Sequence, residues 1–231
     1  PEQAKQAASR SLAMAQKRNH ANSLCAALAD GVCTLATLAG DVAATEIFAD
    51  QLIQLAGANN LGFWHAQGVM LEAWVRSKRS DPQIGIELLR GSIQQWPPEL
   101  RQAAIMSSFA EMLVAGGHVQ EGLSVIREAL RSSAGGHWCT AELLRVRGEI
   151  ERAADRPRAA EASFARALEW SRRHDQKLWE LRAATSCARL WVDRGELKRA
   201  RELLSPVFGA FTEGFGEPDL KAARALLDRF D

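Results

Sequence analysis

The sequence predicts an all-α chain built as a row of stacked helical hairpins. Helix-favouring Ala, Leu, Glu and Arg are abundant, whereas strand-favouring Val and Ile are sparse. Apolar residues recur with a helical period, in segments of ~15–20 residues, a length suited to hairpin helices. Short polar or Gly/Pro breaks separate these segments, at residues 39–41, 59–60, 80–82, 96–98, 116–117, 135–136, 155–157 and 194–195.

A regular alternation of small and large residues indicates how these helices pack. Gly148, Ala160, Phe164 and Ala167 have the spacing Gly-x₁₁-Ala-x₃-Phe-x₂-Ala, which matches the rhythm of a tetratricopeptide-type hairpin. The small residues allow two antiparallel helices to approach closely, and the Phe fills the gap between them. We therefore predict a tetratricopeptide-like right-handed superhelix of about five hairpins with a C-terminal capping helix.

The same rhythm assigns each hairpin in order. The second helices each carry a small residue followed four positions later by a large one: Ala44/Phe48, Gly85/Leu89, Gly122/Ile126, Ala160/Phe164 and Ala200/Leu204. The first helices supply a residue for close contact: Val32, Ala73, Ala110, Gly148 and Ala188. In the first repeat the register could also be shifted by one residue. The hairpins are longer than a strict repeat of about 34 residues by roughly one helical turn.

The two ends of the chain are expected to differ from the repeats between them. Residues 1–18 resemble the second helix of a truncated hairpin, because they share the Ser/small/Leu/Ala spacing of residues 163–173. Residues 19–215 form the predicted array. Residues 216–231 form the predicted cap, since Glu217-Pro218-Asp219 is a helix start with its proline in the first turn. An open array needs such a terminal cap.

Composition argues against several classes of partner. The chain has 29 basic and 28 acidic residues, so no global field attracts nucleic acid or an anionic membrane. The four cysteines are scattered without a C-x-x-C pair, which predicts a reducing cytoplasm. No apolar run is expected to approach the ~18 residues of a membrane span, and the polar opening is not a signal peptide. Because the chain begins with Pro rather than Met, we expect it to be a piece of a longer protein.

Motifs for catalysis and cofactors are missing from the sequence. Neither G-x-x-x-x-G-K-[ST] nor G-x-G-x-x-G occurs, which predicts that no nucleotide is bound through these loops. Cys139 near His137 could be a nucleophile and base, and Cys25 with Cys33 could be metal ligands. No further ligand completes either set, so burial of the thiols in a core is the favoured interpretation. We predict a non-enzymatic chain without metal or cofactor.

A concave surface lined by the first helices is the predicted binding site. Counting from the close-contact residues places eight side chains on it: Gln67, Met70, Trp74, Glu111, Arg145, Glu149, Arg182 and Arg189. Trp74 could be either a rigid anchor for a partner or part of the core. The arginines could take a partner's carboxylates in bidentate pairs. The expected partner is a protein or peptide, or an attached domain of the parent protein, and replacing Arg182 and Arg189 is expected to weaken its binding without unfolding.

A basic stretch over residues 145–201 supports an alternative, nucleic-acid binding. Residues 141–202 hold fifteen basic side chains, but eleven acidic ones are interleaved with them. Much of this pattern is typical of i,i+4 pairs on solvated helix faces. Nucleic acid is therefore an unlikely partner, and any such binding must weaken as salt is added.

The C-terminal stretch, residues 141–228, resembles a known bacterial family. The segments AELLRVRGEI, EASFARALEWSRRHDQKLWELRAATSCARLW and LLSPVFGAFTEGFGEPDLKAARALLD are similar to the C-terminal repeat region of class III adenylate cyclase and predicted-ATPase signalling regulators. The resemblance implies a multidomain regulator with a cyclase or DNA-binding output domain and a nucleotide-binding switch. This chain would be its sensor arm. None of that family's catalytic motifs is present, so no catalytic residue carries over.

Overall fold

The computed structural model describes residues 2–95, 103–132 and 138–230. These residues are helical and contain no strand, which confirms the predicted all-α class. Contacts divide the chain into two compact units, residues 1–101 and 102–231. The predicted division into residues 1–18, 19–215 and 216–231 stays a prediction. Two predicted breaks, 96–98 and 135–136, lie outside the described residues.

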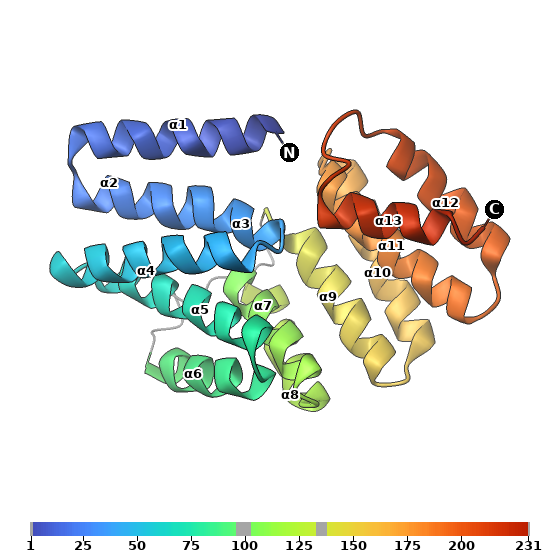
Figure 1. The fold of residues 1–231 in the computed structure, drawn as a ribbon. Coiled ribbons are helices and arrows are strands. Elements are labelled where there is room, and N and C mark those ends of the chain that lie inside the picture. Colours follow the sequence, from blue (N-terminus) through green and yellow to red (C-terminus); the bar gives the residue numbers. More distant parts are fainter. Residues whose placement is uncertain (1, 96–102, 133–137, 231) are drawn as a thin grey trace. The chain divides into compact units, whose positions relative to one another are not determined.

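The N-terminal unit begins with α1 (Glu2–Arg18) and then a continuous helical stretch. That stretch runs through α2 (Ala21–Ala26), the π-helix η1 (Ala27–Cys33) and α3 (Thr34–Leu38), and packs against α1 and α4 (Val42–Ala58). The unit continues with α5 (Gly62–Arg79) and α6 (Pro82–Gln95), each packed on the helix before it (Figure 1). Cys25, Leu28 and Leu52 lie at the centre of its core.

The stretch Ala21–Leu38 corrects one expectation from the sequence. Its mean hydropathy is 1.3 over 18 residues, so by length and composition it could cross a membrane. The prediction that no apolar run approaches this length was wrong. Small residues such as Ala, Gly and Cys make the run inconspicuous, and Asp30 is its single charge. About 28% of the window is buried inside the unit.

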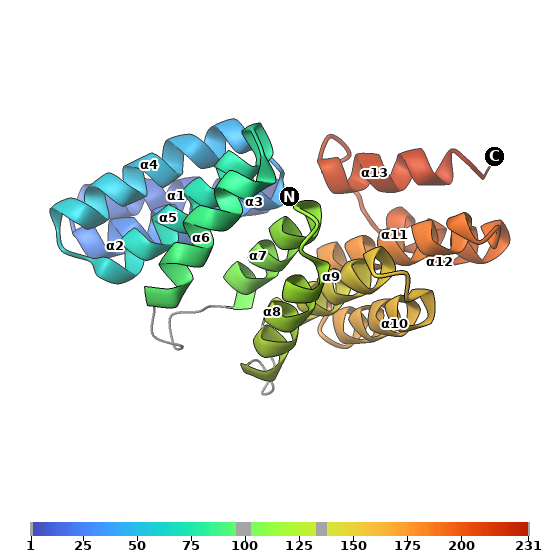
Figure 2. The same ribbon diagram turned by 90° about the horizontal axis from the view of Figure 1, so that it is seen from below.

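The C-terminal unit places its helices in two layers. Its elements are α7 (Ala103–Ala115), α8 (Val119–Ser132), α9 (Thr140–Ala153), α10 (Pro157–Arg173), α11 (Lys177–Asp193), α12 (Leu197–Gly209) and α13 (Pro218–Leu227). Each helix packs on the next, while α7, α9, α11 and α13 also contact the next-but-one helix. As a result α7, α9, α11 and α13 follow one another in one layer, and α8 and α10 lie to the other side of α9 (Figure 2).

One type of link joins most neighbouring helices. At the end of α9, Asp155 has a φ of 54° and its N–H donates to the Arg152 carbonyl, and Arg156 N–H donates to the Glu151 carbonyl at 2.9 Å. This is a Schellman motif, which satisfies carbonyls left free at a helix end. The same pair of bonds occurs with Gly40, Asn60, Gly117, Asp175 and Gly195 at the left-handed position.

Small residues bring the paired helices together as the sequence predicts. A Cβ on Gly148 would collide with the ring of Phe164, and one on Gly85 would collide with the Ala73 carbonyl oxygen. A Cβ on Gly122 would lie 3.3 Å from the Ala110 carbonyl oxygen. Ala188 and Ala200 are likewise completely buried. The close approaches lie between α5 and α6, between α7 and α8, and between α9 and α10, at the small residues that the sequence singles out.

In the first repeat the register is shifted by one residue. Val32, Ala44 and Phe48 are only half-buried. Cys33 and Thr45 are completely buried instead, and Ala49 is 1% exposed. The shift affects both helices equally, so the spacing of twelve residues between their contact positions is retained.

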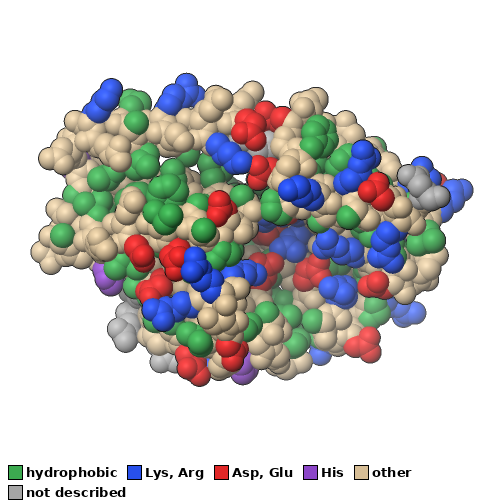
Figure 3. Space-filling view, in the orientation of Figure 1, with side chains coloured by type: hydrophobic (Ala, Val, Ile, Leu, Met, Phe, Trp, Pro, Cys, Tyr) green, Lys and Arg blue, Asp and Glu red, His purple; other side chains and the backbone are tan. Residues whose placement is uncertain are grey.

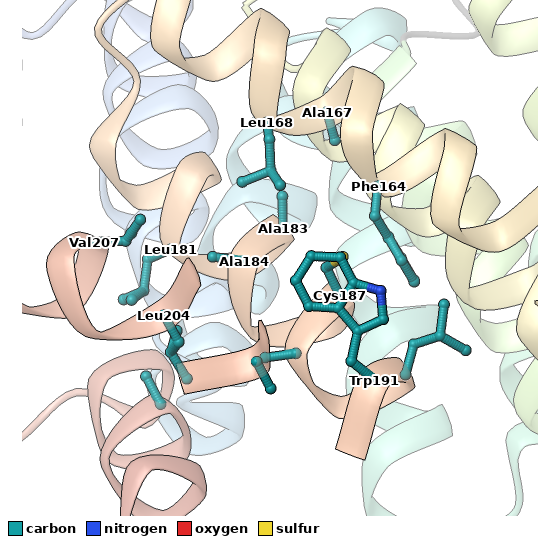
Figure 4. Close-up of a cluster of buried hydrophobic side chains, with 14 of the residues drawn as sticks. Phe164, Ala167, Leu168, Leu181, Ala183, Ala184, Cys187, Trp191, Leu204 and Val207 are labelled. Carbon is teal, nitrogen blue, oxygen red and sulfur yellow. The ribbon is translucent and has the colours of Figure 1, made fainter. Parts of the chain in front are cut away.

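One buried apolar cluster of the C-terminal unit extends from α9 to α13. Phe164 and Leu168 of α10 point toward Ala183, Cys187 and other side chains of α11 (Figure 4). The cluster continues through Ala200, Leu204 and Val207 of α12 to Leu220, Ala223 and Leu226 of α13. The helix α13 therefore covers the apolar side of the last hairpin.

Candidate functional site

A chain of ion pairs crosses the layer formed by α7, α9, α11 and α13. Each of these helices contributes at least one member, and we call the set the ion-pair chain. Its nitrogen–oxygen distances are 2.6 Å for Glu111–Arg145, 2.8 Å for Arg145–Glu142, 3.1 Å for Arg182–Glu142 and 2.8 Å for Arg182–Asp219. The chain of charges joins helices that are far apart in the sequence.

The centre of the ion-pair chain is shielded from solvent. The side chains of Glu142, Arg145 and Arg182 are 10%, 13% and 16% exposed. Burial alone would raise the pKa of Glu142, but the charges of Arg145 and Arg182 outweigh it and hold that pKa below its ordinary value. Burial acts to lower the pKa of both arginines, and the neighbouring carboxylates raise it overall. All three groups are therefore charged at neutral pH.

The ion-pair chain changes the interpretation of two predicted binding residues. Arg145 and Arg182 donate to carboxylates of their own chain, and the predicted residue Glu149 lies 3.9 Å from Arg145. Removing Arg182 would take one of its two arginine partners from the shielded Glu142 and the described ion-pair partner from Asp219. The ion pairs of Arg182 give it a structural role beside the predicted binding role, so we expect its replacement to lower the stability of the fold as well.

The opposite end of the same layer carries an arginine groove. We define it by Arg152, Arg189, Asp193, Ala222, Ala225, Leu226 and Arg229, which line a volume of about 390 Å³. Arg152 pairs with Glu149 at 3.0 Å and lies 3.9 Å from Asp193. Arg189 and Arg229 are exposed, and neither guanidinium has a partner in the part of the chain that the structure describes. Lys and Arg side chains gather over α9, α11 and α13 (Figure 3).

An aromatic pocket lies beside α13. We define it by Phe208, Phe215, Leu220, Lys221, Arg224, Ala225 and Asp228, which line about 360 Å³. Phe215 is 52% exposed, and its ring centroid is 5.9 Å from that of Phe208. The guanidinium of Arg224 lies 5.5 Å from the centroid of the Phe208 ring. This pocket offers an apolar surface with cations at its edge.

The remaining predicted residues lie in the N-terminal unit. Gln67, Met70 and Trp74 all belong to α5. Trp74 is 9% exposed, so it is buried, and Lys78 lies 5.9 Å from its ring centroid. Gln67 and Met70 are half-buried, and the Nε2 atom of Gln67 is buried without a hydrogen-bond partner among the described residues.

The cysteines are surrounded by apolar groups. All four are free and buried, and burial raises the pKa of Cys33, Cys139 and Cys187 to about 12. Such thiols carry little thiolate at neutral pH. His137 lies outside the described residues. Within residues 2–95, 103–132 and 138–230, no three His, Cys, Asp or Glu side chains are placed to hold a metal ion.

The sequence did not identify Asp219 or Arg229 as members of this surface. Asp219 lies six residues before Ala225, just as Glu142 precedes Gly148 and Arg182 precedes Ala188 by six. Treating the last helix as one more first helix of a hairpin would have aligned these positions.

Comparisons with known proteins bear on the fold alone. No protein-family model matches the chain, and no curated protein matches it. Among solved structures, the crystal structure of BtubC (BKLC) from P. vanneervenii is similar, with a TM-score of 0.59 and 18% sequence identity. The match covers 85% of this chain and 89% of that one. At this identity the similarity shows a shared helical fold.

Proposed function

We propose that the chain is a non-catalytic, tetratricopeptide-like repeat module that recognises a protein or peptide partner. The observation that carries this proposal is the layer of α7, α9, α11 and α13. The ion-pair chain holds these helices together at one end of the layer, while exposed arginines face a groove at the other. A rigid layer with unpaired cations is suited to binding a segment that brings its own carboxylates.

The setting of this recognition is also a proposal. The resemblance of residues 141–228 to repeats of bacterial cyclase and ATPase regulators favours a sensor arm whose partner alters an attached domain. Ligand binding would shift the conformations available to that domain. The buried free thiols support a reducing, cytoplasmic setting.

Nucleic-acid binding is the alternative, and the ion pairs weigh against it. At least eight of the fifteen basic residues in 141–202 pair with carboxylates: Arg145, Arg147, Arg152, Arg172, Arg182, Arg194, Lys198 and Arg199. Cations that are already neutralised in this way contribute little to binding phosphates.

A selection experiment tests the proposed function. The 231-residue chain is immobilised and used to select from a displayed library of random peptides. We expect a restricted set of sequences to be enriched over a matrix without protein. Anisotropy of a labelled random duplex DNA, measured in a salt series, tests the alternative. Failure to enrich any peptide, together with salt-sensitive DNA binding, would reverse the ranking.

A further inference from the structure

The helix α13 occupies the position of a first helix, yet its contact residue is uncovered. Its Asp219 joins the ion-pair chain as Glu142 and Arg182 do. By the shared spacing of six residues, Ala225 corresponds to Gly148 and Ala188. Those two positions are buried against other helices of the unit, whereas Ala225 is exposed.

A small residue at this position allows another chain to approach the helix backbone closely. On α9 the space above Gly148 is filled by the Phe164 ring. On α13 the corresponding space is open, and Ala225 lines both the arginine groove and the aromatic pocket. A segment that crosses α13 at Ala225 can therefore reach both hollows at once.

The charges around Ala225 select the kind of segment that fits. The two hollows together are lined by five basic side chains, Arg152, Arg189, Lys221, Arg224 and Arg229, and two acidic ones, Asp193 and Asp228. In the chain as a whole, basic and acidic residues are nearly balanced. Arg152 pairs with Glu149 at 3.0 Å and Arg224 lies 3.9 Å from Asp228. The cations of the two hollows outside the described ion pairs are therefore Arg189, Lys221 and Arg229, and they are complementary to carboxylates.

We propose that α13 is a recognition element for an acidic peptide segment that carries one large apolar residue. The segment crosses α13 over Ala225. Its carboxylates pair with Arg189 and Arg229 in the arginine groove, and its apolar side chain enters the aromatic pocket, against Phe208 and Phe215. This inference rests on the proposed function and names the chemistry of the partner.

Peptides from the selection described above provide the probe. We expect the enriched sequences to combine Asp or Glu with an aromatic or aliphatic residue. Ala225→Trp places a large ring over the crossing point, and it should weaken binding of a labelled enriched peptide at least about tenfold, as loss of an anchoring contact does. Arg189→Glu/Arg229→Glu should weaken it by a similar factor, because each change reverses a charge that faces the carboxylates. Phe215→Ala should remove the preference for the apolar residue.

Arg166→Glu on α10 is the matched control, because Arg166 is exposed and unpaired in the described part of the chain. It should leave affinity unchanged. Circular dichroism establishes that every variant is folded. Enriched peptides that lack acidic residues, or that bind Ala225→Trp as tightly as the parent chain, would overturn this inference while leaving the proposed function intact. A selection that enriches nothing would reject both.

Discussion

Arg182 and Arg189 lie two turns apart on α11, yet they have different surroundings. Arg182 is 16% exposed and bonded to Glu142 and Asp219, whereas Arg189 is exposed beside the arginine groove. A count along a helix places both on the same face. It does not reveal whether a carboxylate from another helix neutralises one of them. The sequence therefore suffices to find the face, but not to separate its structural arginine from its available one.

This difference predicts unequal effects of the two substitutions on stability. Arg182→Ala should lower the free energy of unfolding by about 3 kcal/mol, because it removes the shielded guanidinium that pairs with both Glu142 and Asp219. Arg189→Ala should change it by less than about 0.5 kcal/mol, as is usual for an exposed side chain. Urea denaturation followed by circular dichroism measures both values. Equal effects would mean that the ion-pair chain does not support the fold.

Glu142 should make the free energy of unfolding depend on pH in the acidic range. Its pKa is lowered in the folded chain from an ordinary value of 4.5, so its stabilisation is present above that pH and is lost as pH falls through the folded pKa. Glu142→Gln should flatten the decline in the free energy of unfolding below pH ~4.5. Glu169→Gln, at an exposed carboxylate outside the described ion pairs, should leave the decline unchanged. An unaltered decline in Glu142→Gln would contradict the assignment.

Gly148 tests the close approach of α9 and α10. Gly148→Ala places a methyl group against the Phe164 ring, and overpacking of this kind should cost about 1–3 kcal/mol. Gly209→Ala in α12 is the control, since a Cβ there meets nothing within 4 Å. Thermal unfolding compares the two variants. A neutral Gly148→Ala would show that the hairpin relaxes more freely than its packing indicates.

At the scale of the helix, the repeated links explain why so much could be predicted. Gly, Asn and Asp tolerate the left-handed conformation that a Schellman motif requires, so Gly40, Asn60 and Gly117 mark the ends of helices directly in the sequence. The π-helix η1 (Ala27–Cys33) carries no such mark. Its wider hydrogen-bonding pattern shifts side chains around the helix, and the first repeat is also where the predicted register was one residue out.

A link of this type should depend on the backbone of its left-handed residue. Gly195 has a φ of 79°, and the space that a Cβ would occupy there is open. Gly195→Ala should therefore lower the free energy of unfolding by about 1 kcal/mol through backbone strain alone. Gly209→Ala again serves as the comparison, because it adds the same methyl group without that strain. Chemical denaturation measures the difference in free energy of unfolding between the two variants. Equal stabilities would show that the link adopts another conformation at little cost.

At the scale of the whole molecule, the described residues of each unit include a buried apolar cluster of that unit's own side chains. Cys25, Leu28 and Leu52 belong to the first, and Phe164, Leu181 and Leu204 to the second. Periodic small residues predict that each hairpin packs on its neighbours. They do not predict where one compact unit ends, because the same spacing continues from Ala73/Gly85 to Ala110/Gly122 across the boundary at residue 101.

Separate cores predict separate folding. A fragment of residues 102–231 should keep its helical circular dichroism and unfold cooperatively, because its core is contributed by its own helices. The midpoint temperature of its thermal unfolding should lie within a few degrees of a thermal transition of the full chain. Loss of helix in the isolated fragment would show that the N-terminal unit is needed for its stability.

The short links also restrict how this protein can change length. One residue serves both helices at such a link. Arg156 and Gln176, for example, donate an N–H to the end of the preceding helix and are also the N-caps of the next helix. Inserting one amino acid within a helix would rotate the later residues of that helix by about 100° and turn its contact residues toward water. Gain or loss of a complete hairpin avoids that penalty, so duplication of whole repeats is the route by which such a chain can grow.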